Sequence, residues 1–503
     1  MVASGGSRKR DERVRIELQV LGHALRAVAE EMGAALVRAA FSANIKERRD
    51  CSTALFDDRG RMVAQAEHIP VHLGAMPDAV TAVMEHAPAR TDVYVLNDPF
   101  AGGTHLPDIT LVSRTDVGFA VTRAHHADVG GSEPGSMPAF SRTLEEEGVV
   151  IPPTRIEPGT LERFAARTRA PDERLGDFRA QFAAHRLADA RVADLCARHG
   201  ADRIRDAMEE LISYSERVVR ASIARLPDGR FEAADVLEAP KGDLELRVAV
   251  TIEGDELEVD FTGTAPQYDG NLNCPLAVTR SATYFVVRCL TGPDVPATSG
   301  AFAPVQVAAP SGCLVNAEPG AAVAGGNVET SCRIVDVLFA ALGQAVPVPA
   351  QGQGTMNNLT LGSDRFTYYE TLGGGQGACP DADGPSGVHV TMSNTLTTPV
   401  EALELAYPLR VRRHELRLGS GGAGRHRGGD GVVREVEALE PCRASVLSER
   451  RAHAPAGSAG GAPGERGKNL LNGRELPAKA SVDLARGDVL RLETPGGGGY
   501  GPG

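Results

Sequence analysis

Clustered glycines constrain the fold of this chain more than any other feature of its sequence. The 503 residues include 57 glycines and 32 prolines, and many glycines stand together, as in "ETLGGGQGA" at 370–378, "SGGAGRHRGGDG" at 420–431 and "TPGGGGYG" at 494–501. Glycine permits left-handed backbone and close approach of main chains. We therefore expect many shaped loops, arranged around a site rather than serving as flexible linkers.

Length and composition describe a globular protein with more than one core. A single hydrophobic core usually stops growing at roughly 250–300 residues, so a chain of 503 residues predicts several packed lobes. The 42% hydrophobic and 24% charged residues fit neither a disordered chain nor a collagen-like or coiled-coil protein.

Charge and apolar runs argue against several kinds of partner and location. A net charge of −13 argues against a nucleic-acid surface, which needs clustered Lys and Arg. No run of about 18 apolar residues predicts a membrane-spanning helix, and the amino terminus lacks the apolar segment of a secretory signal. The eight cysteines form no Cys-x-x-Cys pair, which fits a reducing compartment. We expect a soluble, cytoplasmic protein.

Hydrophobic periodicity predicts an α+β (mixed α/β) fold of several lobes. A helix is expected at 14–40, followed by strand patterns as far as residue 124. Helical spacing returns around 160–226, where Gly200 divides it into at least two helices. The predicted parts are a metal-site α/β lobe at 1–155, a helical segment at 156–228, a mixed α/β lobe at 229–350 and a glycine-rich, β-leaning lobe at 351–503.

The segment 451–471, "RAHAPAGSAGGAPGERGKNLL", allows two interpretations. Its composition is that of a flexible linker. Sequence with a strand pattern follows it, however, so we expect an ordered loop that joins two strands.

Three short polar segments in the first 155 residues bring histidines and carboxylates near predicted strand ends. They are "NIKERRD" at 44–50, "NDPFAGGTHLPD" at 97–108 and "RAHHADVGG" at 123–131. Mixed imidazole and carboxylate ligation suits zinc, manganese or iron. A single histidine of this kind is more often structural, but three such segments together predict a divalent metal site. The candidate residues are Asp50, His105, Asp108, His125, His126 and Asp128.

A further pair of histidines lies in "HIPVHLG". His68 and His72 are four residues apart, but Pro70 between them disfavours a helix that would place both on one face. We expect His68 to be structural and His72 to be a site candidate.

Other catalytic patterns are weaker. The chain has no Gly-x-Ser-x-Gly elbow; Ser331, Cys332 and Cys274 are the suggestive nucleophiles, and cysteine is more often a small buried hydrophobe. The segment 370–378 can offer backbone N–H groups to an anion but lacks the Lys-Ser/Thr ending of a P-loop. No dinucleotide fingerprint appears either. We therefore expect that the chain does not bind ATP by itself.

Taken in order, several segments resemble the hydantoinase B family. They include "FSANIKERRDCSTALFDDRGRMVAQAEHIPVHLGAMP", "LNDPFAGGTHLPDITLV", "AHHADVGGSEPGSMP", "GNLNCPLAVTRSA", "GNVETSCRIVD", "YYETLGGGQGA", "HVTMSNTLTTPVEALELAYPLRV", "SGGAGRHRGGDG" and "ETPGGGGYG". The resemblance runs from about residue 14 to 501. This family contains B subunits of ATP-dependent hydantoinases, the C-terminal part of 5-oxoprolinase, and subunits of acetone and acetophenone carboxylases.

The resemblance implies a division of labour between two subunits. A hydantoinase A-type subunit with an actin-like ATPase fold binds ATP and Mg, and it activates the substrate by phosphorylation. The B-type subunit holds a divalent metal, zinc or manganese and possibly iron, and completes the reaction within a hetero-oligomer. Position by position, the implied ligands are Asp50, His105, Asp108 and one histidine of "HHAD", with His126 weakly favoured over His125.

The implied activity is ATP-dependent hydrolysis of a cyclic amide, such as a hydantoin, 5-oxoproline or another lactam. Phosphorylation of the amide oxygen makes a better electrophile, which water activated by the metal can attack. Asp128 or His72 would act as the base or orient a ligand. The alternatives are a B-type subunit of an acetone or acetophenone carboxylase, and a scaffold whose partner carries the chemistry. The chain length favours hydrolysis, and the intact ligand set argues against a scaffold.

Overall fold

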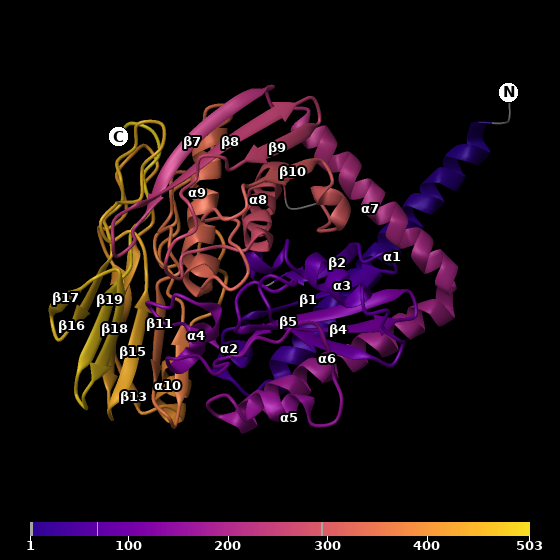
Figure 1. Ribbon diagram of the computed structural model, residues 1–503. Coiled ribbons are helices and arrows are strands. Elements are labelled where there is room, and N and C mark those ends of the chain that lie inside the picture. Colours follow the sequence, from indigo (N-terminus) through magenta and orange to yellow (C-terminus); the bar gives the residue numbers. More distant parts are fainter. Residues whose placement is uncertain (1–3, 68, 293–294) are drawn as a thin grey trace.

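The protein combines several β-sheets with helices packed on them (Figure 1). The structure, a computed structural model, describes residues 4–67, 69–292 and 295–503. Its mixture of helices and largely antiparallel sheets confirms the predicted α+β class. None of the described helices is both long and apolar enough to cross a lipid bilayer.

A six-stranded sheet organises the first part of the chain. Its strands follow the order β2-β1-β5-β4-β3-β6. They are β1 (Cys51–Asp57), β2 (Met62–Glu67), β3 (Val93–Leu96), β4 (Asp108–Thr115), β5 (Gly118–His125) and β6 (Thr154–Arg155). Leu55 packs into one core cluster and the adjacent Phe56 into another, because successive side chains of a strand point to opposite faces. Both faces of the sheet are therefore covered, and β1 and β5 are buried along their whole length.

Helices cover one face of this sheet. The long ones are α1 (Ser4–Ala39), α6 (Pro171–His199) and α7 (Ala201–Ile223), with the short α5 (Thr160–Ala165) before α6. α1 and α6 pack against each other and against the strands. Gly200 separates α6 from α7 with a φ of 87°, as its place in the sequence predicted. Three further short helices are α2 (Ala43–Lys46), α3 (Met76–Met84) and α4 (Leu144–Glu147).

The middle of the chain forms a second, four-stranded sheet with two helices against it. Its order is β10-β9-β8-β7, and β10 pairs with β9 in parallel. The elements are β7 (Gly229–Leu237), β8 (Leu244–Glu253), β9 (Glu256–Asp260), α8 (Leu276–Thr291), β10 (Val305–Ala308) and α9 (Ser331–Leu342). A π-helical turn at Gly326–Thr330 leads directly into α9. Such turns recur at functional sites.

The C-terminal part is a sandwich of two sheets around a shared apolar core. One sheet has the order β12-β11-β15-β18 and the other β13-β14-β19-β16-β17. The elements are β11 (Asn358–Gly362), β12 (Thr367–Glu370), α10 (Val400–Ala406), β13 (Leu409–Arg417), β14 (Gly431–Ala438), β15 (Cys442–Leu447), β16 (Lys468–Leu471), β17 (Arg474–Leu476), β18 (Lys479–Leu484) and β19 (Val489–Glu493). Along β12, Tyr368 faces this core whereas Tyr369 faces the N-terminal part. The sandwich thus presents one sheet to the rest of the protein.

The clustered glycines pack main chain against main chain at one end of this sandwich. A Cβ at Gly428 would lie 2.0 Å from the oxygen of Gly497, and one at Gly461 would lie 2.2 Å from the oxygen of Gly499. No side chain fits at those distances. The same contact ties down the segment 451–471, which connects β15 to β16 and is an ordered loop as predicted. We refer to the segments 373–377, 420–431, 457–464 and 496–499 as the glycine cluster.

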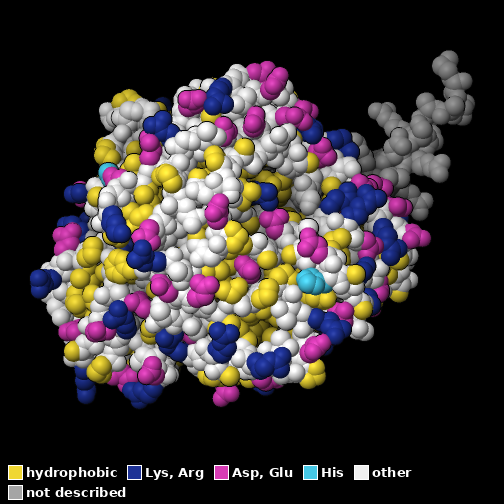
Figure 2. Space-filling view, in the orientation of Figure 1, with side chains coloured by type: hydrophobic (Ala, Val, Ile, Leu, Met, Phe, Trp, Pro, Cys, Tyr) yellow, Lys and Arg dark blue, Asp and Glu magenta, His cyan; other side chains and the backbone are white. Residues whose placement is uncertain are grey.

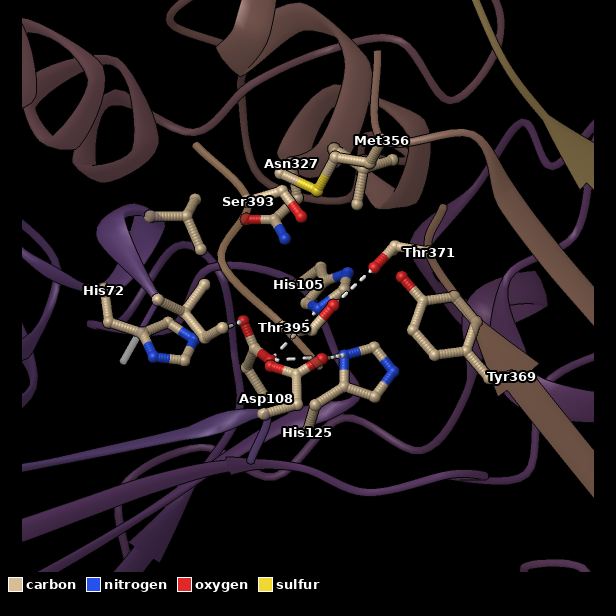
Figure 3. Close-up of a pocket in the computed structure, with 14 residues that line it drawn as sticks. His72, His105, Asp108, His125, Asn327, Met356, Tyr369, Thr371, Ser393 and Thr395 are labelled. Carbon is tan, nitrogen blue, oxygen red and sulfur yellow. Dashed lines mark hydrogen bonds and ion pairs between the residues drawn. The ribbon is translucent and has the colours of Figure 1, made fainter. Parts of the chain in front are cut away.

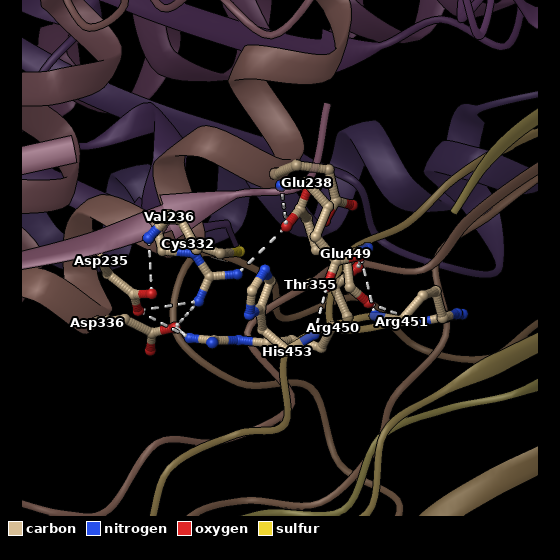
Figure 4. Close-up of polar contacts among 12 residues, drawn as sticks. Asp235, Val236, Glu238, Cys332, Asp336, Thr355, Glu449, Arg450, Arg451 and His453 are labelled. Atoms are coloured by element: carbon tan, nitrogen blue, oxygen red, sulfur yellow. Dashed lines mark hydrogen bonds and ion pairs between the residues drawn. The ribbon is translucent and has the colours of Figure 1, made fainter. Parts of the chain in front are cut away.

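Buried ion pairs join the second sheet and α9 to the C-terminal sandwich (Figure 4). Asp336 of α9 accepts hydrogen bonds from Arg333 at 2.8 Å and from Arg450 at 2.6 Å. Arg450 also pairs with Asp235 of β7 at 3.1 Å. Because these side chains come from three distant segments, they fix how the sandwich sits on the middle sheet.

Charges of both signs alternate on the molecular surface. On the face in Figure 2, Lys and Arg side chains are interspersed with Asp and Glu rather than gathered in one area. Exposed pairs such as Arg205 with Asp58, at 3.1 Å, are typical. This face does not resemble the uniformly basic surfaces that bind nucleic acid.

Candidate metal centre

The order of three neighbouring strands brings the predicted ligands to one edge of the N-terminal sheet. β5 lies between β1 and β4 and is antiparallel to both. The start of β1, the end of β5 and the start of β4 therefore meet. Asp50 immediately precedes β1, His125 ends β5, and Asp108 opens β4 directly opposite His125.

Four buried side chains converge at this edge (Figure 3 shows three of them labelled). Asp108 Oδ1 lies 3.1 Å from His105 Nε2 and 3.5 Å from His125 Nδ1. Asp50 Oδ2 lies 4.0 Å from the same His125 nitrogen. His105, Asp108 and His125 each offer one ligand atom within 4.8 Å of the others. Two imidazole nitrogens and one carboxylate oxygen are thus close enough to hold one ion, with the Asp50 carboxylate beside His125.

The ionisation of these groups suits metal binding. Burial would raise the pKa of Asp108, but His105, His72 and His125 outweigh it and hold that pKa well below its ordinary value. Burial lowers the pKa of His125 despite the nearby Asp108 and Asp50. An ionised carboxylate and a neutral imidazole are the forms that bind metal.

Glycines and an asparagine shape the loop that carries His105. Gly102 has a φ of 97°, and a Cβ at Gly103 would lie 2.4 Å from the oxygen of Asn97. The Asn97 side chain donates to the carbonyls of Leu106 and Val149, both at 2.9 Å. Close backbone packing at the glycines and the hydrogen bonds of one buried asparagine side chain therefore fix this loop.

His72 contacts Asp108 from a different segment. It ends the 3-10 turn Pro70–His72, and its Nε2 lies 3.4 Å from Asp108 Oδ2. Its Nδ1 is 2.9 Å from Ser52 Oγ. Thr104 donates a hydrogen bond to the same Asp108 oxygen at 2.5 Å. The structure thus brings the predicted site residue His72 to the cluster as a neighbour of a ligand. His68, expected to be structural, lies outside the described residues.

The structure reverses the weak preference for His126 over His125. Successive strand residues face opposite ways, so His125 points to Asp108 whereas His126 points to α6. There His126 Nε2 lies 3.1 Å from Gln181 Oε1, and its ring packs on Phe178. Burial lowers the pKa of His126 to about 4. His126 is therefore part of the helix packing and not of the cluster.

Asp128 is also outside the cluster, which corrects its expected role as a base. Its carboxylate accepts hydrogen bonds from the backbone N–H groups of Gly130, Gly135 and Arg169 at 2.9–3.0 Å, and from the Arg169 side chain at 2.9 Å. Because four donors occupy its oxygens, Asp128 fastens the loop after β5 to the loop before α6.

A small pocket with about 20 Å³ of free space lies over the cluster. Its other walls come from residues that spacing arguments did not single out. The lining residues are Asp50, Ile69, Val71, His72, His105, Asp108, His125, Asn327, Val328, Met356, Tyr369, Thr371, Ser393 and Thr395. Tyr369 stacks on His125 with ring centroids 4.6 Å apart. Asn327, on the π-helical turn, is buried and its Oδ1 has no hydrogen-bond partner.

Comparison with known proteins identifies the family. The model of the family described as Hydantoinase B/oxoprolinase matches residues 15–503. The chain belongs to this family. 5-Oxoprolinase 1 of Arabidopsis thaliana is 39% identical over 530 residues, which span 97% of this chain and 42% of that protein. The chain thus spans about two fifths of the length of this relative.

Solved structures share the fold of this hydantoinase B family member. The ATP-dependent caprolactamase from Pseudomonas jessenii has a TM-score of 0.91 at 27% identity, covering 97% of this chain and 91% of that one. Acetone carboxylase in its nucleotide-free form has a TM-score of 0.88 at 18% identity, covering 97% and 76%. The second likeness shows the fold alone.

The segments that carry the family resemblance also supply the far wall of the pocket. "GNVETSCRIVD" contains Asn327, "YYETLGGGQGA" contains Tyr369 and Thr371, and "HVTMSNTLTTPVEALELAYPLRV" contains Ser393 and Thr395. Their presence in distant motifs was the available clue to these residues. No spacing rule connects positions more than 200 residues from His105.

The suggestive nucleophiles and the loop that could have bound an anion have structural roles. Burial raises the pKa of Cys332 to about 12 and that of Cys274 well above its ordinary value. Ser331 Oγ donates to the carbonyl of Asn327 at 2.6 Å. In 370–378, the N–H groups of Gly374, Gly375, Gln376 and Ala378 donate to carbonyl oxygens of neighbouring segments at 2.9–3.0 Å. Those groups are not free to hold an anion.

Proposed function

We propose that this chain is the metal-bearing subunit of an ATP-dependent enzyme that opens cyclic amides. The convergence of Asp50, His105, Asp108 and His125 in one buried pocket carries this proposal. A partner hydantoinase A-type subunit would bind ATP and Mg and phosphorylate the amide oxygen. The family membership supports this assignment, as do the names of the relatives, 5-oxoprolinase and caprolactamase.

The residues present fit a divalent cation, with zinc or manganese preferred and iron also compatible. Each histidine retains a buried ring nitrogen without a partner, Nδ1 of His105 and Nε2 of His125, so neither ring is committed to a hydrogen-bond network elsewhere. When bound, the ion would supply Lewis acidity and lower the pKa of water. Asp50 and Asp108 would balance its two charges.

His72 is suited to hold a proton beside this site. Its Nε2 faces Asp108 and its Nδ1 faces the Ser52 hydroxyl. With Ser52 fixing the ring, Nε2 can accept a proton from water in the pocket and later return it to the leaving nitrogen. We therefore assign to His72 the role of base or of orienter of Asp108.

The far wall favours a cyclic amide over a ketone. Asn327 Oδ1 is a buried acceptor without a partner, and leaving such an atom unpaired costs about 1–3 kcal/mol. The second ring N–H of a hydantoin, or the protonated nitrogen of an O-phosphorylated lactam, can donate to it, whereas a ketone and its enol phosphate have no N–H donor. The side chains of Ile69, Val71, Val328 and Met356 offer apolar contact for the ring carbons.

Metal analysis with a matched variant tests the proposal. We would measure metal content in the purified chain, in Asp108→Asn and in the control Asp116→Ala, whose exposed carboxylate lies in the turn between β4 and β5. The same proteins would then be combined with the A-type partner, ATP, and hydantoin, 5-oxoproline or caprolactam. Near-stoichiometric metal and ATP-dependent ring opening, both lost in Asp108→Asn and kept in Asp116→Ala, are expected.

Other outcomes would redirect the assignment. Metal without ring opening, combined with ATP-dependent incorporation of bicarbonate into a ketone, would identify a carboxylase subunit instead. Absence of metal from the native complex would leave a scaffold role. Metal retained by a folded Asp108→Asn protein would refute the ligand set.

A further inference from the structure

A buried arginine without a carboxylate partner stands behind the far wall of the pocket. Arg48 is fully buried, and its guanidinium donates to the carbonyl of Tyr369 at 2.8 Å and to the hydroxyls of Thr371 and Thr395 at 2.6 and 2.9 Å. Within the described ranges, no ion pair joins Arg48 to a carboxylate. By contrast, the buried Arg434 pairs with Glu370 at 3.2 Å. A positive charge without a partner is expensive in a protein interior.

The charge remains unbalanced when the metal site is filled. Two acidic residues are close to Arg48 in the sequence. Glu47 is half-exposed, and no ion pair joins its carboxylate to Arg48. Asp50 belongs to the proposed ligand set, and with Asp108 it would balance a divalent ion. Arg48 would then carry a single uncompensated charge. That charge favours an anion in the adjacent pocket because electrostatic interactions are strong where water is excluded.

Thr371 and Thr395 lie between Arg48 and the pocket. Both line the pocket, both accept from Arg48 Nη2, and their hydroxyls lie 2.8 Å from each other. Figure 3 shows the pair above the metal cluster, with Ser393 and Asn327 beyond. The hydroxyl oxygens are thus polarised by the guanidinium, which strengthens the hydrogen bonds they can donate.

Hydroxyl protons outnumber the acceptors that surround them. Thr371, Thr395 and Ser393 carry three protons, and the contact between the two threonines uses one. The next neighbour is His389, which lies 2.7 Å from Ser393 and 3.2 Å from Thr395. Burial and Arg48 lower the pKa of His389 to about 3, so it is neutral and accepts at one nitrogen. One hydroxyl proton therefore remains to point into the pocket.

We propose that Thr371 and Thr395, backed by Arg48, bind the phosphoryl group of the activated substrate. This inference rests on the proposed function, since the phosphoryl group arrives from the A-type partner. The group is a tetrahedral anion with several acceptor oxygens, and on the wall opposite the metal ligands it meets one free hydroxyl proton and a positive charge. The two threonines contact the group; Arg48 acts through them.

Binding of inorganic phosphate tests the assignment. We would measure it by isothermal titration calorimetry on the full chain, with its metal and after chelation, in wild type and in Thr371→Val/Thr395→Val. Loss of hydrogen bonds to a charged ligand predicts at least about tenfold weaker binding in the double variant. Thr279→Val is the matched control, because Thr279 is equally buried but donates to Val315 outside the pocket. Thr371→Ser/Thr395→Ser keeps both hydroxyls and should restore binding.

Three outcomes would overturn the inference. These are no phosphate binding by wild type in either metal state, equal binding by the valine variant, and acetate binding as tightly as phosphate at the same threonines. The last result would identify a site for a substrate carboxylate. If the complex opens the ring but its phosphate affinity is the same with and without the two threonine hydroxyls, this inference is refuted and the proposed function stands. Threonine-dependent phosphate binding without ring opening would do the reverse.

Discussion

The metal centre and the glycine cluster are both built from irregular loops, but they satisfy their polar groups in opposite ways. At the metal centre, buried side-chain atoms remain without partners, among them His105 Nδ1, His125 Nε2 and Asn327 Oδ1. In the glycine cluster, backbone groups pair with one another, as when Gly422 donates to Gly497 at 2.8 Å and Gly497 to Gly429 at 2.9 Å. Unpartnered buried atoms mark a place prepared for a ligand, whereas paired ones mark a structural element.

The difference also explains why glycine serves two purposes in one chain. Near the metal centre, Gly102 lets a single loop turn so that His105 and Asp108 can converge. In the cluster, many glycines act together because each lacks the Cβ that would collide with a neighbouring carbonyl. The first use positions a site, and the second replaces side-chain packing with main-chain packing.

The largest effect is expected from a single methyl group in the glycine cluster. In Gly428→Ala, the new Cβ would lie 2.0 Å from the oxygen of Gly497, so neighbouring main chains must separate. We expect a loss of stability of more than about 3 kcal/mol, measured by thermal and urea unfolding. The control is Gly473→Ala, which has open space around it but a φ of 80°, and which should cost only about 1 kcal/mol. Equal losses would mean that main-chain packing does not stabilise the cluster.

The next largest effect distinguishes the role of His125 in metal binding from that of His126. His125→Gln should weaken metal binding by more than about 100-fold. Loss of a ligand should cost at least as much affinity as loss of a residue that hydrogen-bonds to a ligand. His126→Gln should keep the metal and lower only stability, since it disturbs the contact with Gln181. Competition with a chelator measures both affinities. Equal loss of affinity in the two variants would contradict the orientation of β5.

Much of the scaffold could be predicted from the sequence. The helix at 14–40, the strands before residue 125 and the break at Gly200 follow from apolar spacing and glycine placement. Spacing also brought Asp50, His105 and Asp108 together. It could not choose between His125 and His126, because β5 is buried on both faces and its side chains do not alternate between polar and apolar. The family resemblance did not resolve this choice either.

The rest of the site depends on contacts between distant segments. Tyr369, Thr371 and Thr395 reach the pocket because the C-terminal sandwich packs on the N-terminal sheet, and Asn327 reaches it from the π-helical turn before α9. Arg48 is adjacent to a predicted ligand in sequence, but its partners lie more than 300 residues away. Local periodicity contains no information about such contacts. Composition misleads as well at 451–471, where a linker-like sequence is held by backbone hydrogen bonds.

The last effect depends on pH and concerns a buried carboxyl group on the π-helical turn. Burial and the nearby Glu449, opposed by Lys479, raise the pKa of Glu329 to about 8. Its Oε1 accepts from Met356 N–H at 3.2 Å and from Asn358 at 2.8 Å, whereas Oε2 has no hydrogen-bond partner. Between pH 4.5 and 8 the unfolded chain releases the carboxyl proton and the folded protein retains it, so stability falls as pH rises.

Glu329→Gln should remove this contribution, because the amide keeps an acceptor at the Oε1 position and has no proton to lose. Relative to wild type, the free energy of unfolding of the variant should therefore increase between pH 5 and pH 8, by at most about 1.4 kcal/mol for each pH unit. Urea unfolding at the two pH values measures the gain, with the exposed Glu232→Gln as control. If the difference in stability between variant and wild type did not change with pH, Glu329 would be ionised in the folded protein. Its unpartnered oxygen would then need another donor, and the contrast with the paired backbone groups of the glycine cluster would weaken.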